Sequence, residues 1–299
     1  MISQKTFREN VEKNAALRNK YHRRIIFYLT KIKRFRHNLY KKKVEGDFIF
    51  LTICNLKAFP MVRASIYSFL KNSDLIPKKV VIISDGSWSV DVGINHFSDF
   101  KIQFEFETWE SCAEYFRNKN EEYLYKWAEQ QIWGKKMAAI LKYAETTMVL
   151  FSDPDVLWYG NPVKREYLKN DFYLKLSLDN SHNYDKELIQ KMDAEYLYSL
   201  PPINCGIVLI KGDMFIKSNI LSRSIEIESE KPGDFSEQTI FALMENEFGS
   251  VFSENEVSTT ISDILSPVWK KSRYNNQLKA RHYVWNLKWI LWRDFLTHI

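Results

Sequence analysis

Two carboxylates stand one residue apart after a strongly apolar segment in the middle of the chain. Asp153 and Asp155 flank Pro154, and residues 147–151 before them read Thr-Met-Val-Leu-Phe. Charged groups beside such a segment cost free energy unless a partner offsets their desolvation, and Mg²⁺ or Mn²⁺ would do so because hard cations prefer oxygen ligands. Pro154 fixes its own φ and favours an extended Asp153, which would put both side chains on one side. The spacing therefore predicts a metal site that could also bind a diphosphate.

The same tripeptide has a simpler interpretation as a turn, because Asp and Pro are both common turn formers. On Asp-Pro-Asp alone the turn is favoured. The apolar residues 147–151 before it and 156–158 after it shift the interpretation toward the metal site.

A metal site at this position needs a scaffold, and the hydrophobic pattern supplies one. Apolar, β-branched runs predict strands at 48–54, 78–84, 102–106, 147–151, 172–178 and 207–210. Helical spacing predicts helices at 59–70, 111–144 (as two helices broken at Gly134), 213–229 and 236–247. Alternating strands and helices predict one α/β domain with a mostly parallel sheet flanked by helices. Ligands of such sheets bind beyond the carboxyl ends of the strands, where Asn55, Asp85 and the two aspartates stand.

Four segments together resemble a known family. Residues 133–162, WGKKMAAILKYAETTMVLFSDPDVLWYGNP, are similar to the core of GT-A-fold glycosyltransferases, closest to family 8 and its relatives. Residues 202–210, PINCGIVLI, resemble the family's Asn-x-Gly before a strand. Glu237 and Gln238 resemble its Asp-Gln pair at a helix start, and His282 resembles its C-terminal histidine. The resemblance extends over residues 48–289 in organisation.

The resemblance implies a Rossmann-like GT-A domain and a nucleotide-sugar glycosyltransferase with Mn²⁺ or Mg²⁺ as cofactor. The implied metal ligands are Asp153, Asp155 and His282. The implied sugar-binding and catalytic residues are Asn204, Glu237 and Gln238. The implied nucleotide-sugar residues are Asn55, Asp85, Lys135 (or its neighbour Lys136), Asp153, Asp155, Gly206 and Lys288. The implied substrates are a UDP-sugar donor and an acceptor hydroxyl on a glycan or glycolipid, as in bacterial-type surface glycans.

Stereochemistry stays open at this point. Family 8 implies retention of the anomeric configuration, with the leaving phosphate accepting the acceptor's proton. However, residues 83–87, Ile-Ser-Asp-Gly-Ser, look more like the inverting family 2. Glu237 also replaces the usual Asp, and Trp285 and Trp289 replace a Gly and a Pro on either side of Lys288.

Other classes of protein explain less of the sequence. A sugar nucleotidyltransferase would need a glycine-rich loop after the first strand, but residues 54–58 read Cys-Asn-Leu-Lys-Ala. A nucleic-acid-binding protein would explain the basic N-terminus but not the paired carboxylates, so no nucleic-acid partner is expected. A non-catalytic protein that keeps the fold, or a membrane-binding one, stays open. Three widely spaced cysteines argue against a zinc site or a disulfide framework.

The charge of the chain is divided unevenly. Residues 1–43 contain fourteen Lys and Arg against two Glu, a net +12, so the other residues sum to −6 against the total of +6. We predict a basic, mostly helical arm at 1–45, a GT-A catalytic domain at 46–281, and an aromatic and basic segment at 282–299 that completes the site. No apolar run is long enough to span a membrane.

The expected location is the cytoplasm, with peripheral attachment at the inner face of the membrane left open. The basic arm, residues 1–43, could bind an anionic membrane surface. Trp285, Trp289 and Trp292 recur at helical spacing, which suits either a membrane interface or packing against the domain.

Overall fold

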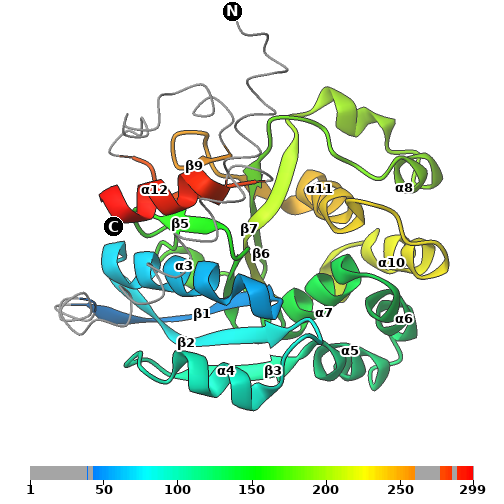
Figure 1. The fold of residues 1–299 in the computed structure, drawn as a ribbon. Coiled ribbons are helices and arrows are strands. Elements are labelled where there is room, and N and C mark those ends of the chain that lie inside the picture. The colour runs from blue at the N-terminus through cyan, green and yellow to red at the C-terminus, as the bar shows by residue number, and fades with distance from the viewer. Residues whose placement is uncertain (1–38, 40–42, 260–276, 285–287, 299) are drawn as a thin grey trace, which may run out of the picture.

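The structure is a computed structural model that describes Leu39 and residues 43–259, 277–284 and 288–298 (Figure 1). The predicted helical arm, residues 1–45, lies outside the described residues except for Leu39 and residues 43–45, of which Val44 and Glu45 belong to β1. Trp285 lies outside them as well.

The centre of the fold is a seven-stranded sheet with the order β3-β2-β1-β4-β7-β6-β8. Its strands are β1 (Val44–Cys54), β2 (Leu75–Ser84), β3 (Phe104–Thr108), β4 (Met148–Ser152), β6 (Tyr173–Leu178), β7 (Ile203–Lys211) and β8 (Ser250–Val251). Only β7 runs against the others, pairing antiparallel with β4 and β6. The remaining neighbours pair in parallel, which confirms the mostly parallel sheet.

The predicted strands are present, with shifted ends. β1 begins at Val44 because residues 44–46 pair with residues 75–77 of β2. β3 lies at 104–108 instead of 102–106, because its residues align with 80–84 of β2. Both faces of the inner strands are buried, which explains their continuous apolar runs.

Helices cover both faces of the sheet (Figure 1). One face packs against α3 (Phe59–Asn72), α4 (Val90–Phe97) and α12 (Lys288–His298). The other packs against α5 (Trp109–Arg117), α6 (Glu122–Gln130), α7 (Ile132–Ala144), α8 (Lys186–Lys191), α10 (Leu221–Glu230) and α11 (Ser236–Phe248). Alternate residues of the inner strands belong to the two cores, for example Leu150 to the first and Phe151 to the second.

The prediction for residues 111–144 was wrong in its helix break. Three helices, α5, α6 and α7, occupy this part of the chain, and Gly134 lies inside α7. A Cβ at Gly134 would lie 2.6 Å from the backbone N of Ala128, so the glycine permits the close contact of α6 and α7. Residues 213–229, predicted as one helix, form α9 (Met214–Lys217) and α10.

A second, three-stranded sheet joins the end of the chain to the middle. It has the order β5 (Val156–Trp158), β10 (Ala280–His282) and β9 (Val257–Ser258). β10 pairs antiparallel with β5, so His282 lies opposite Val156. The C-terminal histidine is thereby brought beside the aspartates.

The C-terminal helix α12 is part of the core. Ile290, Leu291 and Trp292 are almost completely buried. The indole of Trp292 is therefore not available to a membrane surface. Of the two interpretations of this tryptophan, the structure supports packing against the domain. No helix among the described residues is long and apolar enough to cross a membrane. The division at residues 45 and 281 stays a prediction.

Candidate functional site

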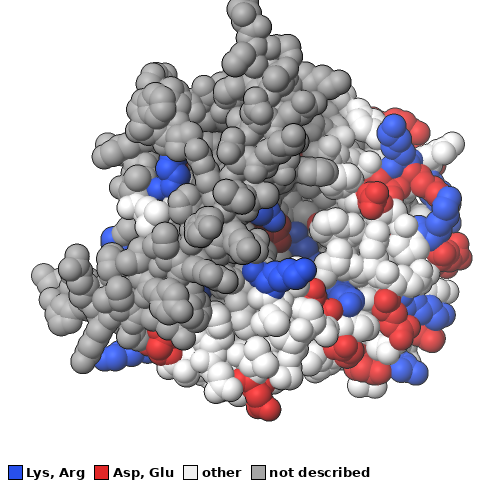
Figure 2. Space-filling model, in the orientation of Figure 1, with Lys and Arg blue, Asp and Glu red and all other residues white. Residues whose placement is uncertain are grey.

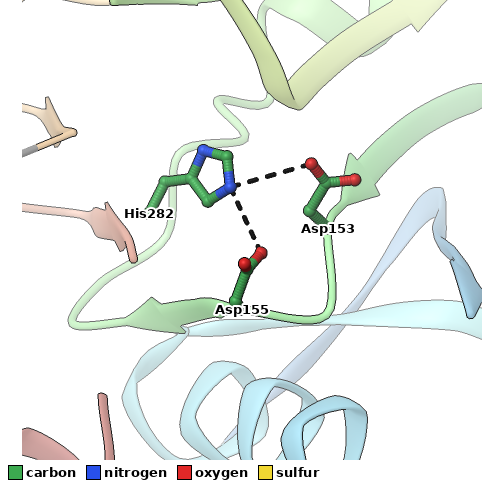
Figure 3. A group of neighbouring side chains, drawn as sticks. All are labelled: Asp153, Asp155 and His282. Carbon is green, nitrogen blue, oxygen red and sulfur yellow. Dashed lines mark hydrogen bonds and ion pairs between the residues drawn. The ribbon is translucent and has the colours of Figure 1, made fainter. Parts of the chain in front are cut away.

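Three potential metal ligands meet where β4 ends. Asp153 directly follows β4, Asp155 precedes β5, and His282 is the last residue of β10. His282 Nε2 lies 3.2 Å from Asp155 Oδ1 and 3.7 Å from Asp153 Oδ2 (Figure 3). One ligating atom from each residue lies within 4.8 Å of the other two. The structure thus brings together the three residues that the sequence predicted as metal ligands.

The imidazole of His282 rests directly on β7. Strands β6 and β7 pair Leu176 with Val208 but Ser177 with Asn204, so β7 bulges in between. A Cβ at Gly206 in this bulge would lie 2.2 Å from Cε1 of His282. Gly206 is therefore required by the close approach of the imidazole to the strand.

The charges of the site compensate one another. Burial alone would raise the pKa of Asp155, but His282 and Lys288, whose Nζ lies 3.1 Å from Asp155 Oδ2, hold that pKa well below its usual range. Burial alone would lower the pKa of His282, but the Asp155 carboxylate outweighs it and raises that pKa. His282 and Lys288 thus offset the negative charge of Asp155.

The donor set fits a divalent cation. Two carboxylates and one imidazole, all directed at one point, supply the oxygen and nitrogen ligands that Mn²⁺ accepts and that Mg²⁺ accepts in part. All three side chains are mostly buried, with Asp153 the most exposed at 24%. That leaves an accessible side for a ligand.

Lys136 lies on the other side of Asp153. Its Nζ is 3.2 Å from Asp153 Oδ1 and 3.5 Å from Glu237 Oε1. Burial opposes the charge on Lys136, yet Asp153, Cys205 and Glu237 outweigh it and raise the pKa of the amine. Lys135 points elsewhere: its Nζ donates to the backbone O of Asp85 at 2.9 Å. Of the two lysines considered in the sequence, Lys136 is the one beside the aspartates.

Glu237 is a buried carboxylate with one free oxygen. Its Oε1 accepts a hydrogen bond from the Cys205 thiol at 3.1 Å, whereas its Oε2 has no hydrogen-bond partner within the described part of the chain. Burial raises the pKa of Glu237 although Lys136 opposes that shift. A buried acceptor of this kind is costly unless a ligand donates to it.

Two side-chain amides complete this side of the site. Asn204 Oδ1 lies 2.9 Å from His282 Nδ1 and accepts from the backbone N of Gly206 at 2.9 Å. Gln238 Nε2 donates to the backbone O of Asn183 at 2.9 Å. Both amides also donate to Asp179, at 3.2 and 3.4 Å.

Two neighbouring cavities meet at the aspartates. A cavity of about 440 Å³ is lined by Trp133, Lys136, Asp153, Asp155, Asp179, Asn183, Asn204, Cys205, Gly206, Asp234, Phe235, Glu237, Gln238, His282 and Val284. A second, of about 350 Å³, is lined by Ile53, Cys54, Asn55, Lys57, Ala58, Met61, Asp85, Ile132, Trp133, Lys136, Asp153, Pro154, Asp155 and Lys288. Figure 2 shows basic and acidic side chains meeting in a hollow near the centre of this face. A ligand with two parts could thus lie across the metal ligands.

The predicted nucleotide residues line the second cavity, except for Gly206 and Lys135. Asn55 and Asp85 line it at the ends of β1 and β2, where each side chain also accepts a local backbone N–H, from Ala58 and Ser87. Lys288 lines it too, and Gly206 lies in the first cavity. Lys135 belongs to neither lining.

Sequence reasoning missed several residues of the first cavity, notably Asp179, Cys205, Asp234 and Phe235. Asp179 follows β6 in the way that Asp153 follows β4, which was the available signal. Cys205 is the variable residue of the Asn-x-Gly segment, and Asp234 and Phe235 carry no motif of their own.

No protein-family model and no curated protein matches this sequence. Solved structures resemble its fold. The apo form of mouse xyloside xylosyltransferase 1 is 13% identical over 82% of this chain and 99% of that chain, with a TM-score of 0.51. The chain has a GT-A-type fold. The galactosyltransferase LgtC, in complex with donor and acceptor sugar analogues, gives 14% identity over 85% and 97% of the two chains and a TM-score of 0.45. The likeness to xyloside xylosyltransferase 1 confirms the predicted GT-A-type single α/β domain, and at 13% identity it extends to the fold alone.

Proposed function

We propose that this protein is a metal-dependent glycosyltransferase that moves a sugar from a UDP-sugar to a hydroxyl of a glycan or glycolipid. The observation that carries the proposal is the group of Asp153, Asp155 and His282 at the junction of two cavities. A nucleotide sugar has the matching shape: a nucleoside and a sugar on either side of a diphosphate. Its diphosphate would lie at the junction.

The metal would be held by the two aspartates and the histidine. When bound, Mn²⁺ or Mg²⁺ supplies positive charge that stabilises the departing diphosphate. Lys136 lies against Asp153 and Lys288 against Asp155, and the two ammonium groups would add two point charges toward the same phosphates. Both lysines pair with the carboxylates, which holds their positive charge beside the proposed diphosphate position.

The first cavity would hold the sugar and the second the nucleoside. Glu237 offers its unpaired Oε2 to a sugar hydroxyl, and Asn204 and Gln238 line the same wall. Asn55 and Asp85 line the second cavity at the ends of β1 and β2, and they would bind the uracil there.

The carboxylates that line the first cavity favour a reaction with retention of the anomeric configuration. Lys136 and Cys205 contact Oε1 of Glu237, its Oε2 is assigned here to a sugar hydroxyl, and Asp179 accepts from two amides, so both carboxylates have binding partners in this arrangement. In a retaining reaction the leaving phosphate accepts the proton of the acceptor hydroxyl, and no protein base is needed. An inverting reaction would need one, and the exposed Asp234 on the cavity wall is its candidate.

The test measures hydrolysis and transfer of UDP-sugars with Mn²⁺ and with EDTA. Asp153→Asn and Asp155→Asn should each lower kcat by about 10²-fold or more, the usual effect of removing one electrostatic contact to the transition state. Asp171→Asn, an exposed aspartate before β6, serves as the matched control. NMR of the anomeric proton of the product decides between retention and inversion. Near wild-type kcat in either site variant, with Mn²⁺ supplied, would contradict the proposal.

A further inference from the structure

Three carboxylates besides the two aspartates of the proposed metal site line the first cavity. Asp179 follows β6, Asp234 stands two residues before α11, and Glu237 is the second residue of α11. They come from separate segments of the chain, and the fold brings them to one space. Among the described residues that line this space there is one lysine, Lys136, and no arginine. That lysine is already held by Asp153 and Glu237.

More lysines line the second cavity, on the nucleotide side of the site. Its lining includes Lys57, Lys136 and Lys288, against one carboxylate, Asp85, besides the two metal aspartates. Positive charge is thus concentrated where the nucleoside and diphosphate would lie, and negative charge where the sugar would lie. An anionic group on the sugar would therefore face the acidic part of the site.

Glu237 is the carboxylate of the first cavity that points to a ligand. The residue is only 3% exposed, and both Cys205 and Lys136 contact its Oε1. Its Oε2 has no hydrogen-bond partner within the described part of the chain. A buried acceptor without a partner is costly, and a ligand that donates a hydrogen bond to it removes that cost. The cavity is thereby suited to a group that donates.

The side-chain amides of the same wall donate within the protein. Gln238 Nε2 donates to the backbone O of Asn183 at 2.9 Å and to Asp179 at 3.4 Å, which uses both of its N–H bonds. Asn204 Nδ2 donates to Asp179, and Asn183 Nδ2 donates to Ser181 Oγ. The amides therefore add few donors to the cavity, and Gln238 offers it a carbonyl oxygen.

We propose that the first cavity selects a sugar that carries hydroxyl or ammonium groups and no carboxylate, with Glu237 as the specificity-determining residue. A carboxylate on the sugar would only accept hydrogen bonds, so it would meet acceptors where it needs donors, and like charges as well. Sugar hydroxyls donate, and one of them supplies the partner that Oε2 of Glu237 lacks. The inference rests on the proposed function for a nucleotide sugar in the two cavities, and it adds the class of that sugar.

Matched pairs of UDP-sugars measure this selectivity without knowledge of the natural donor. UDP-glucose and UDP-glucuronate differ only at the sixth carbon, a CH₂OH group in one and a carboxylate in the other, as do UDP-galactose and UDP-galacturonate. Within a pair, the ratio of dissociation constants, measured by calorimetry with the full chain and Mn²⁺, cancels the contribution of the nucleoside and the diphosphate. The neutral member of the preferred pair should bind about 10²-fold more tightly, because placing like charges together costs that much. The ratio of kcat/KM for hydrolysis should agree.

Substitutions assign the selectivity to its residue. Glu237→Gln keeps the shape of the side chain, removes its charge and adds an N–H that can donate to a carboxylate, so the ratio in the preferred pair should fall by about 10-fold or more. Asp234→Asn should lower the ratio by less, because Asp234 is exposed and solvent screens its charge. Asp171→Asn is the matched control: this exposed aspartate precedes β6 and is not among the residues that line the cavity, so the ratio should not change.

Each outcome settles a separate point. If the wild-type protein binds and hydrolyses the acidic member of a pair as well as the neutral one, the proposed selectivity is wrong and the proposed function stands. If the wild type discriminates and a folded Glu237→Gln protein discriminates equally, the assignment to Glu237 is wrong. Thermal unfolding shows whether this variant folds; if it does not, the wild-type ratio and Asp234→Asn still decide. If no UDP-sugar is bound or hydrolysed with Mn²⁺, the proposed function fails and this inference fails with it.

Discussion

Gly206→Ala tests the contact on which the metal site depends. The backbone of Gly206 is not in the left-handed region, so alanine can adopt its conformation and the effect of the substitution is steric. The new Cβ would lie 2.2 Å from Cε1 and 2.3 Å from Nδ1 of His282. An ordinary contact begins near 3.4 Å, so the imidazole must retreat by about 1.2 Å, the difference between the two distances.

His282 cannot retreat without losing its partners. It is 5% exposed, and its ring nitrogens contact Asn204 and Asp155. A displacement of about 1 Å in an active site can lower the rate by about 10²-fold, which corresponds to about 2.7 kcal/mol in activation free energy. We expect a loss of this size in kcat/KM, and a Mn²⁺ affinity about 10- to 100-fold weaker.

The assay combines Mn²⁺ titration, UDP-sugar hydrolysis and thermal unfolding of the variant. Gly160→Ala is the matched control, because the nearest atom to its new Cβ, at 2.9 Å, is Cδ of the flexible Lys279 side chain. A folded Gly206→Ala protein with the Mn²⁺ affinity and turnover of the wild type would refute the reasoning, since it would show that His282 can move without effect on the site.

Three further predictions concern other parts of the molecule. Gln238→Ala should lower kcat while UDP affinity, measured by calorimetry, stays unchanged; a large loss of UDP affinity would place Gln238 at the nucleotide instead. Burial raises the pKa of Glu228 to about 7, so its contribution to stability is present below pH 4.5 and is lost as the pH rises through 7. Denaturant titrations at pH 5 and pH 8 should show that Glu228→Gln raises the free energy of unfolding relative to the wild type by up to about 3 kcal/mol at pH 8 and by less at pH 5. The same difference between variant and wild type at the two pH values would refute this prediction. The full chain should co-sediment with anionic vesicles at low salt and dissociate from them at high salt. A chain beginning at Glu45 should bind the vesicles much less. Equal binding by the two chains would show that the basic arm, residues 1–43, is not what binds the membrane.

Local chemistry made part of this molecule predictable. The apolar run before Asp153 and the alternation of strands and helices were sufficient to predict the sheet and to place the two aspartates at the end of β4. Resemblance of short motifs supplied His282, because nothing in local spacing connects it to Asp155, 127 positions away. The reason is that β10 and β5 meet only in the folded chain.

The errors came from contacts between distant residues. Gly134 has the local character of a helix break, but it lies inside α7 because α6 approaches it closely. Gly206 stays a prediction as a nucleotide-sugar residue, and its close contact with the ring of His282 could not be predicted from the sequence. Asp179 belongs to no motif, and only its contacts with Asn204 and Gln238 identify it.

The pairing of β10 with β5 also has a meaning for folding kinetics. Contacts between residues far apart in sequence form late, because the chain between them must first lose much of its conformational entropy. The sheet strands β1, β2 and β4 can order together with their connecting helices before β10 arrives. A partly folded chain would then carry Asp153 and Asp155 without the imidazole. Its ability to bind the metal tightly would appear only with the last step of folding, so that metal affinity itself reports the completion of the native structure.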